Sequence, residues 1–295
     1  MGAARIAVVT SEAGVDHDVD LPLIVDALRA DGLAAKSVAW DADSVAWDEF
    51  DLAVIRSTWD YAERLGEFLA WADTTARATR LWNPAPVVRW NSDKRYLLKL
   101  AERGVPVVPT HCVEPGGRFD EGDFDRPEGV VVKPSVSAGA RDTARYEPGR
   151  HADAVRHART LLDQGRSVLI QPYLRLVEEG ERALVFIGGT FSHAIRKGPV
   201  LTEPGVIDNS RVAHPSVTPY RPTDVELHTA LAALNAIPSP AAPLFARVDL
   251  ALNETREPVV MELELIEPNL FLQSNPQGLV RFVEAVAAEI RIPTL

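Results

Sequence analysis

The stretch Val130-Val-Val-Lys-Pro-Ser-Val-Ser-Ala-Gly-Ala140 joins a short apolar run to a lysine and a loop of small residues. The apolar run predicts a buried strand, and a lysine at the end of such a strand is unfavourable unless it meets an anion. Backbone N–H groups of a small-residue loop can closely approach phosphate oxygens. No Walker A motif is present. The pattern indicates either a phosphate site or an exposed lysine above an ordinary turn, and the candidate phosphate contacts are Lys133, Ser135, Ser137, Ala138 and Gly139.

A second stretch, Leu169-Ile-Gln-Pro-Tyr-Leu174, ends a predicted strand at a proline. Backbone groups left free there lie near Tyr173 and Leu174, which suits the edge and faces of an adenine ring. The alternative is a strand end with ordinary core side chains. One of the acidic residues that follow can hold ribose hydroxyls, although a solvated acidic loop explains each one equally well.

A third pattern lies in two strands near the C-terminus, Phe245-Ala-Arg-Val-Asp249 and Met261-Glu-Leu-Glu264. Side chains alternate along a strand, so Arg247 shares a face with Asp249, and Glu262 with Glu264. If the strands are neighbours, three carboxylates converge, and such hard oxygen ligands favour Mg²⁺. Arg247 can then contact a transferred phosphate. The alternative is an antiparallel pair with one solvated polar face.

A fourth pattern, Arg56-Ser57-Thr58, follows a predicted parallel strand. Open α/β sheets bind ligands at the carboxyl ends of their strands. Arg56 is therefore a candidate for holding a substrate carboxylate, and a helix N-cap made by Ser57 or Thr58 is the alternative.

The order of elements predicts an α/β protein that begins with a small open α/β domain over about residues 1–88. Hydrophobic periodicity and breaker residues define each element. Strands are expected at 5–10, 34–40, 52–57, 130–134, 167–171, 183–187, 190–196, 244–252 and 258–265. Helices are expected at 20–31, 61–78, 92–104, 151–164, 222–235 and 277–290, with a polar, Pro-rich mobile loop at 199–221.

Composition bounds the class of protein. The chain has 295 residues, 46% of them hydrophobic and 25% charged, which is typical of a globular protein with about two domains. A net charge of −11 argues against general binding to nucleic acid or anionic membrane. The first residues, MGAARIAVVT, are expected to form a short strand rather than a signal peptide, and no apolar run reaches the length needed to span a membrane. The single cysteine, Cys112, excludes an internal disulfide, and we expect a cytoplasmic protein.

The order of these motifs resembles the ATP-grasp family over about residues 84–275. Asp93-Lys94 looks like the entry to that family's nucleotide domains, Lys133 with its loop like its phosphate cover, and Gln171–Leu174 like its adenine linker. The resemblance implies two further nucleotide contacts, Glu181 on the ribose and Lys197 on the phosphates. It also implies Arg247 and Lys133 as catalytic groups, and Asp249, Glu262 and Glu264 as ligands for Mg²⁺ or Mn²⁺.

The same resemblance implies an architecture of three parts. An N-terminal α/β domain (1–88) precedes two α+β subdomains that clasp ATP, a central one (89–172) and a C-terminal one (173–295). Three positions depart from the family pattern. Gln171 stands where many members have Glu, Glu264 where many have a metal-binding Asn, and Glu267-Pro268-Asn269 replaces a short Pro-Gly turn.

RSTWDY (56–61), VVRWNSDKRYL (87–97) and MELELIEPNLFL (261–272) most resemble a bacterial glutathione-synthetase-like or RimK-like subgroup. That subgroup includes the cyclo-ligase that closes the cycloserine ring from O-ureido-serine, an antibiotic-biosynthesis reaction. The implied activity is ligation of an amino-acid-like carboxylate, activated as an acyl phosphate, to an amine, in a cytoplasmic enzyme that is a candidate homodimer. A small-molecule kinase and a non-catalytic ATP-binding module are the alternatives. The expected substrate contacts are Arg56, Ser57, Thr58, Arg196, Glu267 and Asn269.

Overall fold

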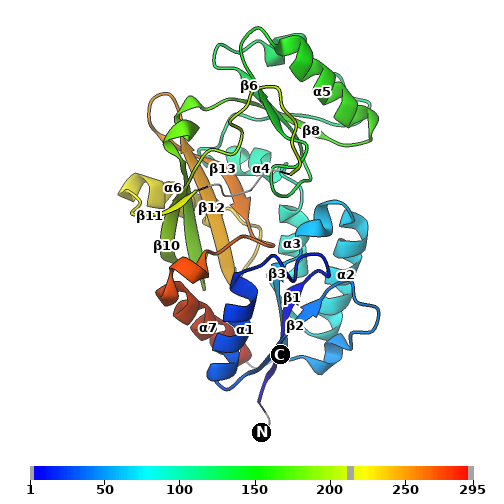
Figure 1. Ribbon diagram of the computed structural model, residues 1–295, viewed down its shortest axis with the longest axis vertical. Coiled ribbons are helices and arrows are strands. Elements are labelled where there is room, and N and C mark those ends of the chain that lie inside the picture. The colour runs from blue at the N-terminus through cyan, green and yellow to red at the C-terminus, as the bar shows by residue number, and fades with distance from the viewer. Residues whose placement is uncertain (1–2, 211–215, 292–295) are drawn as a thin grey trace.

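The computed structural model describes residues 3–210 and 216–291 and contains three sheets (Figure 1). Each sheet draws its strands from a different part of the chain. They meet around one cavity, so the fold brings together groups that lie far apart in the sequence.

The first sheet is parallel and has the order β2-β1-β3-β4. Its central strands are buried on both faces, as expected for a parallel sheet. Ile6 and Val8 of β1 pack with α1 on one face, while Ala7 and Val9 pack with α2 on the other. The elements are β1 (Arg5–Thr10), α1 (Asp20–Ala30), β2 (Ala34–Ala39), β3 (Leu52–Ser57), the short 3₁₀ turn η2 (Trp59–Ala62), α2 (Leu65–Ala78) and β4 (Arg80–Trp82).

The second sheet is antiparallel with the order β5-β8-β6-β7. Apolar residues of α5 pack on one face of it and close a separate small core. Its strand β6 carries Lys133 toward the cavity. The elements are β5 (His111–Val113), β6 (Val130–Pro134), β7 (Ala144–Tyr146), α5 (His151–Asp163) and β8 (Val168–Pro172).

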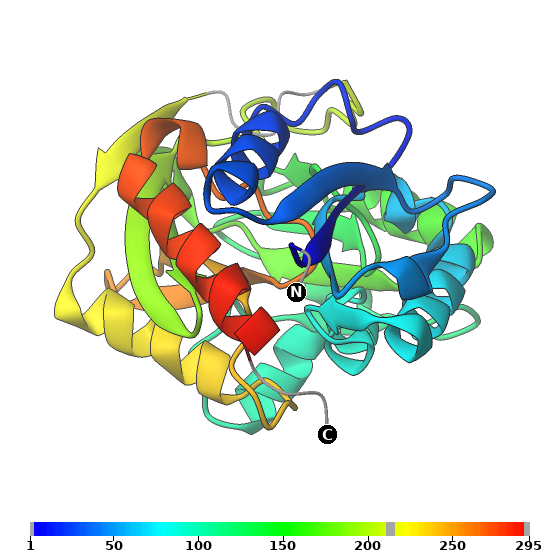
Figure 2. The same ribbon diagram turned by 90° about the horizontal axis from the view of Figure 1, so that it is seen from below.

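The third sheet has the order β11-β10-β9-β12-β13 and is antiparallel throughout. Alternate residues of β9 face different cores: Val185 packs with α7, and Phe186 packs with α6. Helices α6 and α7 therefore cover opposite faces (Figure 2). The elements are β9 (Glu181–Ile187), β10 (Thr190–Lys197), β11 (Val217–Tyr220), α6 (Asp224–Asn235), β12 (Phe245–Leu252), β13 (Pro258–Glu264) and α7 (Pro276–Arg291).

The prediction of one helix over 92–104 is wrong for residues 92–95, which lie between two helices. The chain forms two short helices instead, α3 (Ala85–Asn91) and α4 (Tyr96–Glu102). Prolines are tolerated in the first turn of α3 because the N–H groups there have no helical partner. Asn91 is the last residue of α3, and its side-chain amide donates to the Leu263 carbonyl and accepts from the Leu265 N–H, which fixes α3 to β13.

Four short strands were not predicted from the sequence: β4, β5, β7 and β11. Strand β11 lies within the expected loop at 199–221. Strands of three or four residues are too short for alternation to be recognised. Positions 211–215 of that loop lie outside the described residues.

Candidate functional site

A cavity of about 840 Å³ lies among the three sheets. The N-terminal part contributes Trp59 and Tyr61, and the central sheet contributes Lys133 and Gln171. Strands β9 to β13 contribute half of the charged groups: Glu181, Lys197, Arg247, Glu262 and Glu264. The lining residues named in the sequence predictions are Lys94, Lys133, Ser137, Ala138, Gly139, Gln171, Tyr173, Leu174, Glu181, Lys197, Arg247, Glu262, Glu264, Glu267 and Asn269.

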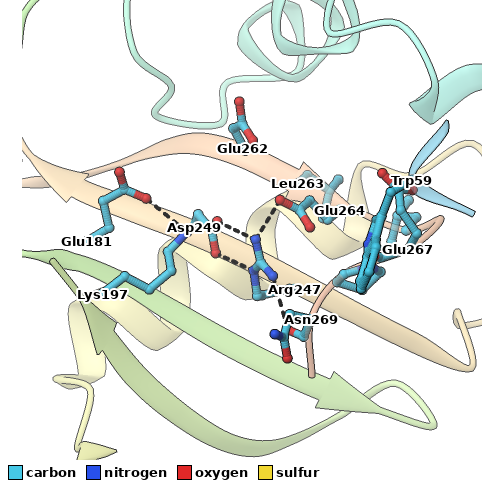
Figure 3. A network of polar contacts seen from close by, with 12 residues as sticks. Trp59, Glu181, Lys197, Arg247, Asp249, Glu262, Leu263, Glu264, Glu267 and Asn269 are labelled. Atoms are coloured by element: carbon cyan, nitrogen blue, oxygen red, sulfur yellow. Dashed lines mark hydrogen bonds and ion pairs between the residues drawn. The ribbon is translucent and has the colours of Figure 1, made fainter. Parts of the chain in front are cut away.

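Buried Arg247 is the centre of a polar network on β12 and β13 (Figure 3). Its Nε donates to Asp249 Oδ1 at 2.9 Å and its Nη2 to Asp249 Oδ2 at 3.0 Å. The same Nη2 donates to Glu264 Oε1 at 2.5 Å. The strand register explains the contact, because Arg247 is opposite Glu264 and Asp249 is opposite Glu262. The predicted pairing of the two strands therefore brings these four side chains together.

Lys197 extends this network from β10. Its Nζ lies 2.6 Å from Asp249 Oδ2 and 2.9 Å from Glu181 Oε2. Burial acts to lower the pKa of Lys197, but the two carboxylates outweigh it and raise the pKa above the ordinary value. Burial likewise acts to raise the pKa of Asp249, and Arg247 and Lys197 lower it well below the usual range. Lys197 and Asp249 are therefore both charged at neutral pH.

Two further lysines approach the cavity near the small-residue loop. Lys133 Nζ lies 3.2 Å from Glu262 Oε1, and Lys94 Nζ donates to the Ser137 carbonyl at 2.5 Å. Burial lowers the pKa of Lys133. For Glu262, burial acts to raise the pKa, but Lys94 and Lys133 bring it down to about 2.

Ser135 does not line the cavity. Its N–H donates to the Ser167 carbonyl at 2.9 Å, and its own carbonyl accepts from the Lys94 N–H at 2.7 Å. The residue therefore anchors the loop, while the next turn, Ser137 to Gly139, faces the cavity. Gly139 has a φ of 61°, a left-handed conformation that a glycine adopts without strain.

The orientation of the Gln171 amide follows from a chain of hydrogen bonds. The Thr110 hydroxyl donates to the Val108 carbonyl at 2.8 Å, so it must accept from Gln171 Nε2, 2.9 Å away. The amide oxygen of Gln171 is therefore left as an acceptor at the cavity wall. Tyr173 and Leu174 line the wall beside it.

Four predicted substrate contacts, Arg56, Ser57, Thr58 and Arg196, do not line the cavity. Arg196 is exposed, because alternation on β10 turns it away from buried Lys197. The Ser57 hydroxyl donates to Thr10 Oγ1 at 2.8 Å. Thr58 is buried, and neither it nor Ser57 makes a side-chain cap for η2.

Arg56 is 2% exposed and is enclosed by acids from the segment before and within α1. Its Nε lies 3.0 Å from Asp18 Oδ2, and its Nη2 lies 3.4 Å from Asp20 Oδ2. Its Nη1 donates to the Pro268 carbonyl. Asp20 also accepts from the N–H groups of Leu272 and Gln273 at 3.1 and 2.9 Å. The guanidinium therefore fixes the loop 267–273 to the N-terminal sheet and does not face a ligand.

That loop carries Glu267 and Asn269 into the cavity. The Trp59 indole N–H donates to the Glu267 carbonyl at 3.1 Å, and Arg247 Nη1 donates to the Asn269 carbonyl at 3.0 Å. Burial, and then the charge of Glu264, raise the pKa of the Glu267 carboxyl to about 8. Trp59 and Tyr61 were not predicted from the sequence as cavity residues, although both follow Arg56 in the RSTWDY motif that was singled out.

The three predicted metal ligands are not preassembled as a metal centre. Within residues 3–210 and 216–291, no group of three or more His, Cys, Asp or Glu side chains could hold a metal ion. The reason is that protein cations stand between the carboxylates: Asp249 pairs with Arg247 and Lys197, Glu264 with Arg247 and Glu262 with Lys133. The donor set, carboxylate oxygens on neighbouring strands, nonetheless fits Mg²⁺ chemically.

No helix in the part of the chain that the structure describes is long and apolar enough to cross a bilayer. Cys112 is a free thiol on β5, half-buried.

Comparison with known proteins gives a consistent set of relatives. A family model described as D-cycloserine synthetase DcsG, N-terminal domain, matches residues 6–83. The cycloserine biosynthesis protein DcsG of Streptomyces lavendulae is 36% identical over 301 residues, covering 97% of this chain and 99% of that protein.

Solved structures agree. The crystal structure of D-cycloserine synthetase DcsG has a TM-score of 0.88 at 35% identity, covering 98% of this chain and 100% of that one. The RimK domain ATP-grasp protein from Sphaerobacter thermophilus DSM 20745 has a TM-score of 0.67 at 18% identity, covering 95% of this chain and 98% of the other.

Proposed function

Because the chain belongs to the DcsG family of ATP-grasp ligases, we propose that it activates an amino-acid-like carboxylate with Mg-ATP and joins it to a nitrogen nucleophile. Membership confirms the predicted ATP-grasp fold and the predicted class of enzyme, an ATP-dependent ligase. The observation that carries the proposal is the convergence of four cations, Lys94, Lys133, Lys197 and Arg247, on one cavity. These four cations can pair with the phosphate oxygens of a triphosphate, and the acids beside them can meet its metal ion.

The nucleotide is proposed to lie between a central unit (89–172) and a C-terminal unit (173–295). The amide oxygen of Gln171 accepts from the adenine amino group, with Tyr173 and Leu174 against the ring. Glu181 holds the ribose. This arrangement is supported by the fixed amide orientation and by the presence of all four side chains in the lining of the cavity.

The phosphates are proposed to contact Lys94, Lys133, Lys197 and the loop from Ser137 to Gly139. Each lysine already contacts a carboxylate or carbonyl oxygen in the cavity, so phosphate oxygens replace those contacts when ATP binds. Exchange of one anion for another keeps the lysines paired. This avoids the free-energy cost of an isolated buried charge.

Asp249, Glu262 and Glu264 are proposed to hold Mg²⁺, with Mn²⁺ as a substitute. When bound, the metal offsets negative charge on the transferred phosphoryl group. Glu262 and Glu264 are half-buried and line the cavity, so they are the more accessible ligands, whereas Asp249 is buried behind them.

The proposed reaction has two steps. A substrate carboxylate oxygen attacks the γ-phosphorus of ATP, which forms an acyl phosphate and releases ADP. A nitrogen nucleophile then attacks the acyl carbon, loses its proton, and inorganic phosphate leaves. Arg247 stabilises the negative charge that develops on the oxygens at the reacting centre. We propose an intramolecular nucleophile, and hence ring closure, because the relative with 36% identity is a cycloserine biosynthesis protein.

The proposal is tested by ADP release in the presence of Mg²⁺ and a panel of carboxylates that includes O-ureido-serine. Mass spectrometry distinguishes a cyclic or amide product from a stable phosphorylated one, which a kinase would make. Lys133→Met and Asp249→Asn should abolish turnover, and Lys99→Met, at an exposed lysine on α4, should not. Absence of Mg-ATP binding to the wild type, or full activity in Lys133→Met, would refute the assigned roles.

A further inference from the structure

Five glutamates line the cavity, and four of them have a cationic partner. Glu63 pairs with Arg141, Glu181 with Lys197, Glu262 with Lys133 and Glu264 with Arg247. Among the described residues, Glu267 is the lining glutamate that forms no ion pair, and its carboxyl accepts a hydrogen bond from its own backbone N–H. A half-buried carboxylate without an ion pair is unfavourable, which agrees with the raised pKa of Glu267, and a cationic group of a ligand beside it would stabilise its ionised form.

The backbone around this carboxylate is held rigidly. The Glu267 carbonyl accepts from Trp59 Nε1 at 3.1 Å, the Pro268 carbonyl from Arg56, and the Asn269 carbonyl from Arg247 Nη1 at 3.0 Å. Three consecutive carbonyls are therefore fixed by three side chains. A site fixed in this way binds with less loss of conformational entropy.

The surroundings of Glu267 are aromatic. The Trp59 indole lies beside Glu267, since its N–H donates to the Glu267 carbonyl (Figure 3). Tyr61 also lines the cavity, where burial and then the nearby charge of Glu267 raise its pKa. An aromatic face next to a carboxylate attracts a compact organic cation, since both groups stabilise positive charge. Lys133 and Lys197 are paired with other acids of the network, and Lys94 and Arg247 act on Glu267 only from beyond ion-pair distance, so no side chain in the described part of the chain neutralises Glu267 directly.

We propose that Glu267, beside the Trp59 indole, binds a primary ammonium group of the carboxylate substrate and thereby selects substrates that keep a free amino group. This inference rests on the proposed ligase function and assigns recognition of the substrate's amino group to Glu267 and Trp59. Glu267 follows Glu264, the partner of Arg247, by three residues. The charges of Glu264 and Arg247 act on Glu267, so an ammonium held by Glu267 lies near the Arg247 network, where the reaction is proposed to occur.

A second divalent cation explains the corner less well than an ammonium group. Mg²⁺ takes six oxygen ligands, mostly carboxylates, phosphates and waters. Trp59 and Tyr61 offer an aromatic surface instead, and an indole face does not coordinate Mg²⁺.

The test is calorimetric titration of protein saturated with Mg²⁺ and a non-hydrolysable ATP analogue. The probes are O-ureido-serine and its deamino counterpart, 3-(ureidooxy)propanoate. Glu267→Gln should bind the amino probe roughly 10- to 100-fold more weakly than the wild type, as expected for loss of a charged hydrogen bond, while its affinity for the deamino probe is unchanged. Trp59→Leu should likewise weaken binding of the amino probe and leave the affinity for the deamino probe unchanged. Glu284→Gln, an exposed acid on α7, is the charge-matched control.

Several results overturn the ammonium site. They are equal weakening of both probes, no weakening of either, or a wild type that does not prefer the amino probe. A tenfold increase in the Mg²⁺ concentration needed for activity, with the affinity for the amino probe unchanged, assigns Glu267 to the metal instead. Binding of the ATP analogue by each variant shows that it is folded. ADP release by the wild type is scored separately, so failure of the ligase function is distinguished from failure of the ammonium site.

Discussion

Replacement of Arg56 by Met is expected to destabilise the protein strongly, although Arg56 does not contact the cavity. The substitution leaves Asp18 and Asp20, which are 5% and 0% exposed, without their cation, and frees the Pro268 carbonyl. Removing one partner of a buried ion pair costs about 3–5 kcal/mol. In chains somewhat smaller than this one, each kcal/mol of lost stability lowers the melting temperature by roughly 2–4 °C. The melting temperature of Arg56→Met should therefore fall by on the order of 10 °C.

The assay is thermal unfolding followed by circular dichroism, with urea unfolding as a second measure. Arg221→Met, at an exposed arginine, is the matched control and should melt within about 1 °C of the wild type. The variant Asp18→Asn/Asp20→Asn/Arg56→Met removes all three charges and should recover part of the lost stability. An Arg56→Met protein as stable as the control would refute the buried ion-pair interpretation.

The same variant also tests how the loop 267–273 is positioned. Arg56 acts on the cavity only through the Pro268 carbonyl, so at a temperature where the variant is folded the KM for the carboxylate substrate should rise. The Kd for ATP should stay within twofold of the wild-type value. Arg56→Lys keeps the charge and should restore more of the stability than of the KM, because it lacks the planar set of donors that reaches Asp18, Asp20 and Pro268 together. An equal loss of affinity for ATP and substrate would contradict a role restricted to this loop.

Three further outcomes are expected. The Glu267 pKa of about 8 lies above its value in the unfolded chain, so the native state binds an extra proton between these two values. The free energy of unfolding should therefore fall as the pH rises from about 5 to 8. In urea titrations, this fall should be smaller for Glu267→Gln than for the wild type. Gln171→Leu should raise the Kd for ATP about 5- to 10-fold in calorimetry, as expected for one lost hydrogen bond, and leave the affinity for inorganic triphosphate unchanged. Excess EDTA should abolish ADP release without lowering the melting temperature, because Lys133 and Arg247 already neutralise the acids proposed to bind Mg²⁺.

The strands of the site could be predicted from the sequence because alternation carries information on its own. Arg247 and Asp249 share a face, as do Glu262 and Glu264, and a short turn between their strands makes antiparallel pairing the expected arrangement. The position of Arg56 at the carboxyl end of a parallel strand was likewise predicted. The alternation rule does not reveal what packs against that strand end, however. Asp18 and Asp20 precede Arg56 by 38 and 36 positions, and only the packing of α1 brings them to it.

The cation partners inside the cavity were beyond prediction for a similar reason. Lys197 and Asp249 are separated by 52 positions, and the strand β9 lies between their own strands in the sheet. Alternation along a strand identifies each charged residue that shares a buried face, but the order of the strands in the sheet determines which charged residues form ion pairs. The predicted cluster of three metal-binding carboxylates assumed that only a metal could compensate them, whereas the structure compensates each with a lysine or arginine.

The ion pairs between lysines and carboxylates in the cavity couple the binding of ATP to the binding of Mg²⁺. Lys133 and Glu262 neutralise each other in the structure, and so do Lys197 and Asp249. A triphosphate that arrives with Mg²⁺ supplies an anion for each lysine and a cation for each carboxylate, so both halves of a pair gain a partner at the same time. ATP alone would displace Glu262 and Asp249 without compensating them, and Mg²⁺ alone would do the same to the lysines. Binding of nucleotide and metal should therefore be strongly cooperative: calorimetry should show a much lower Kd for ATP with Mg²⁺ than without it, and similar values would show that these pairs stay closed when the nucleotide binds.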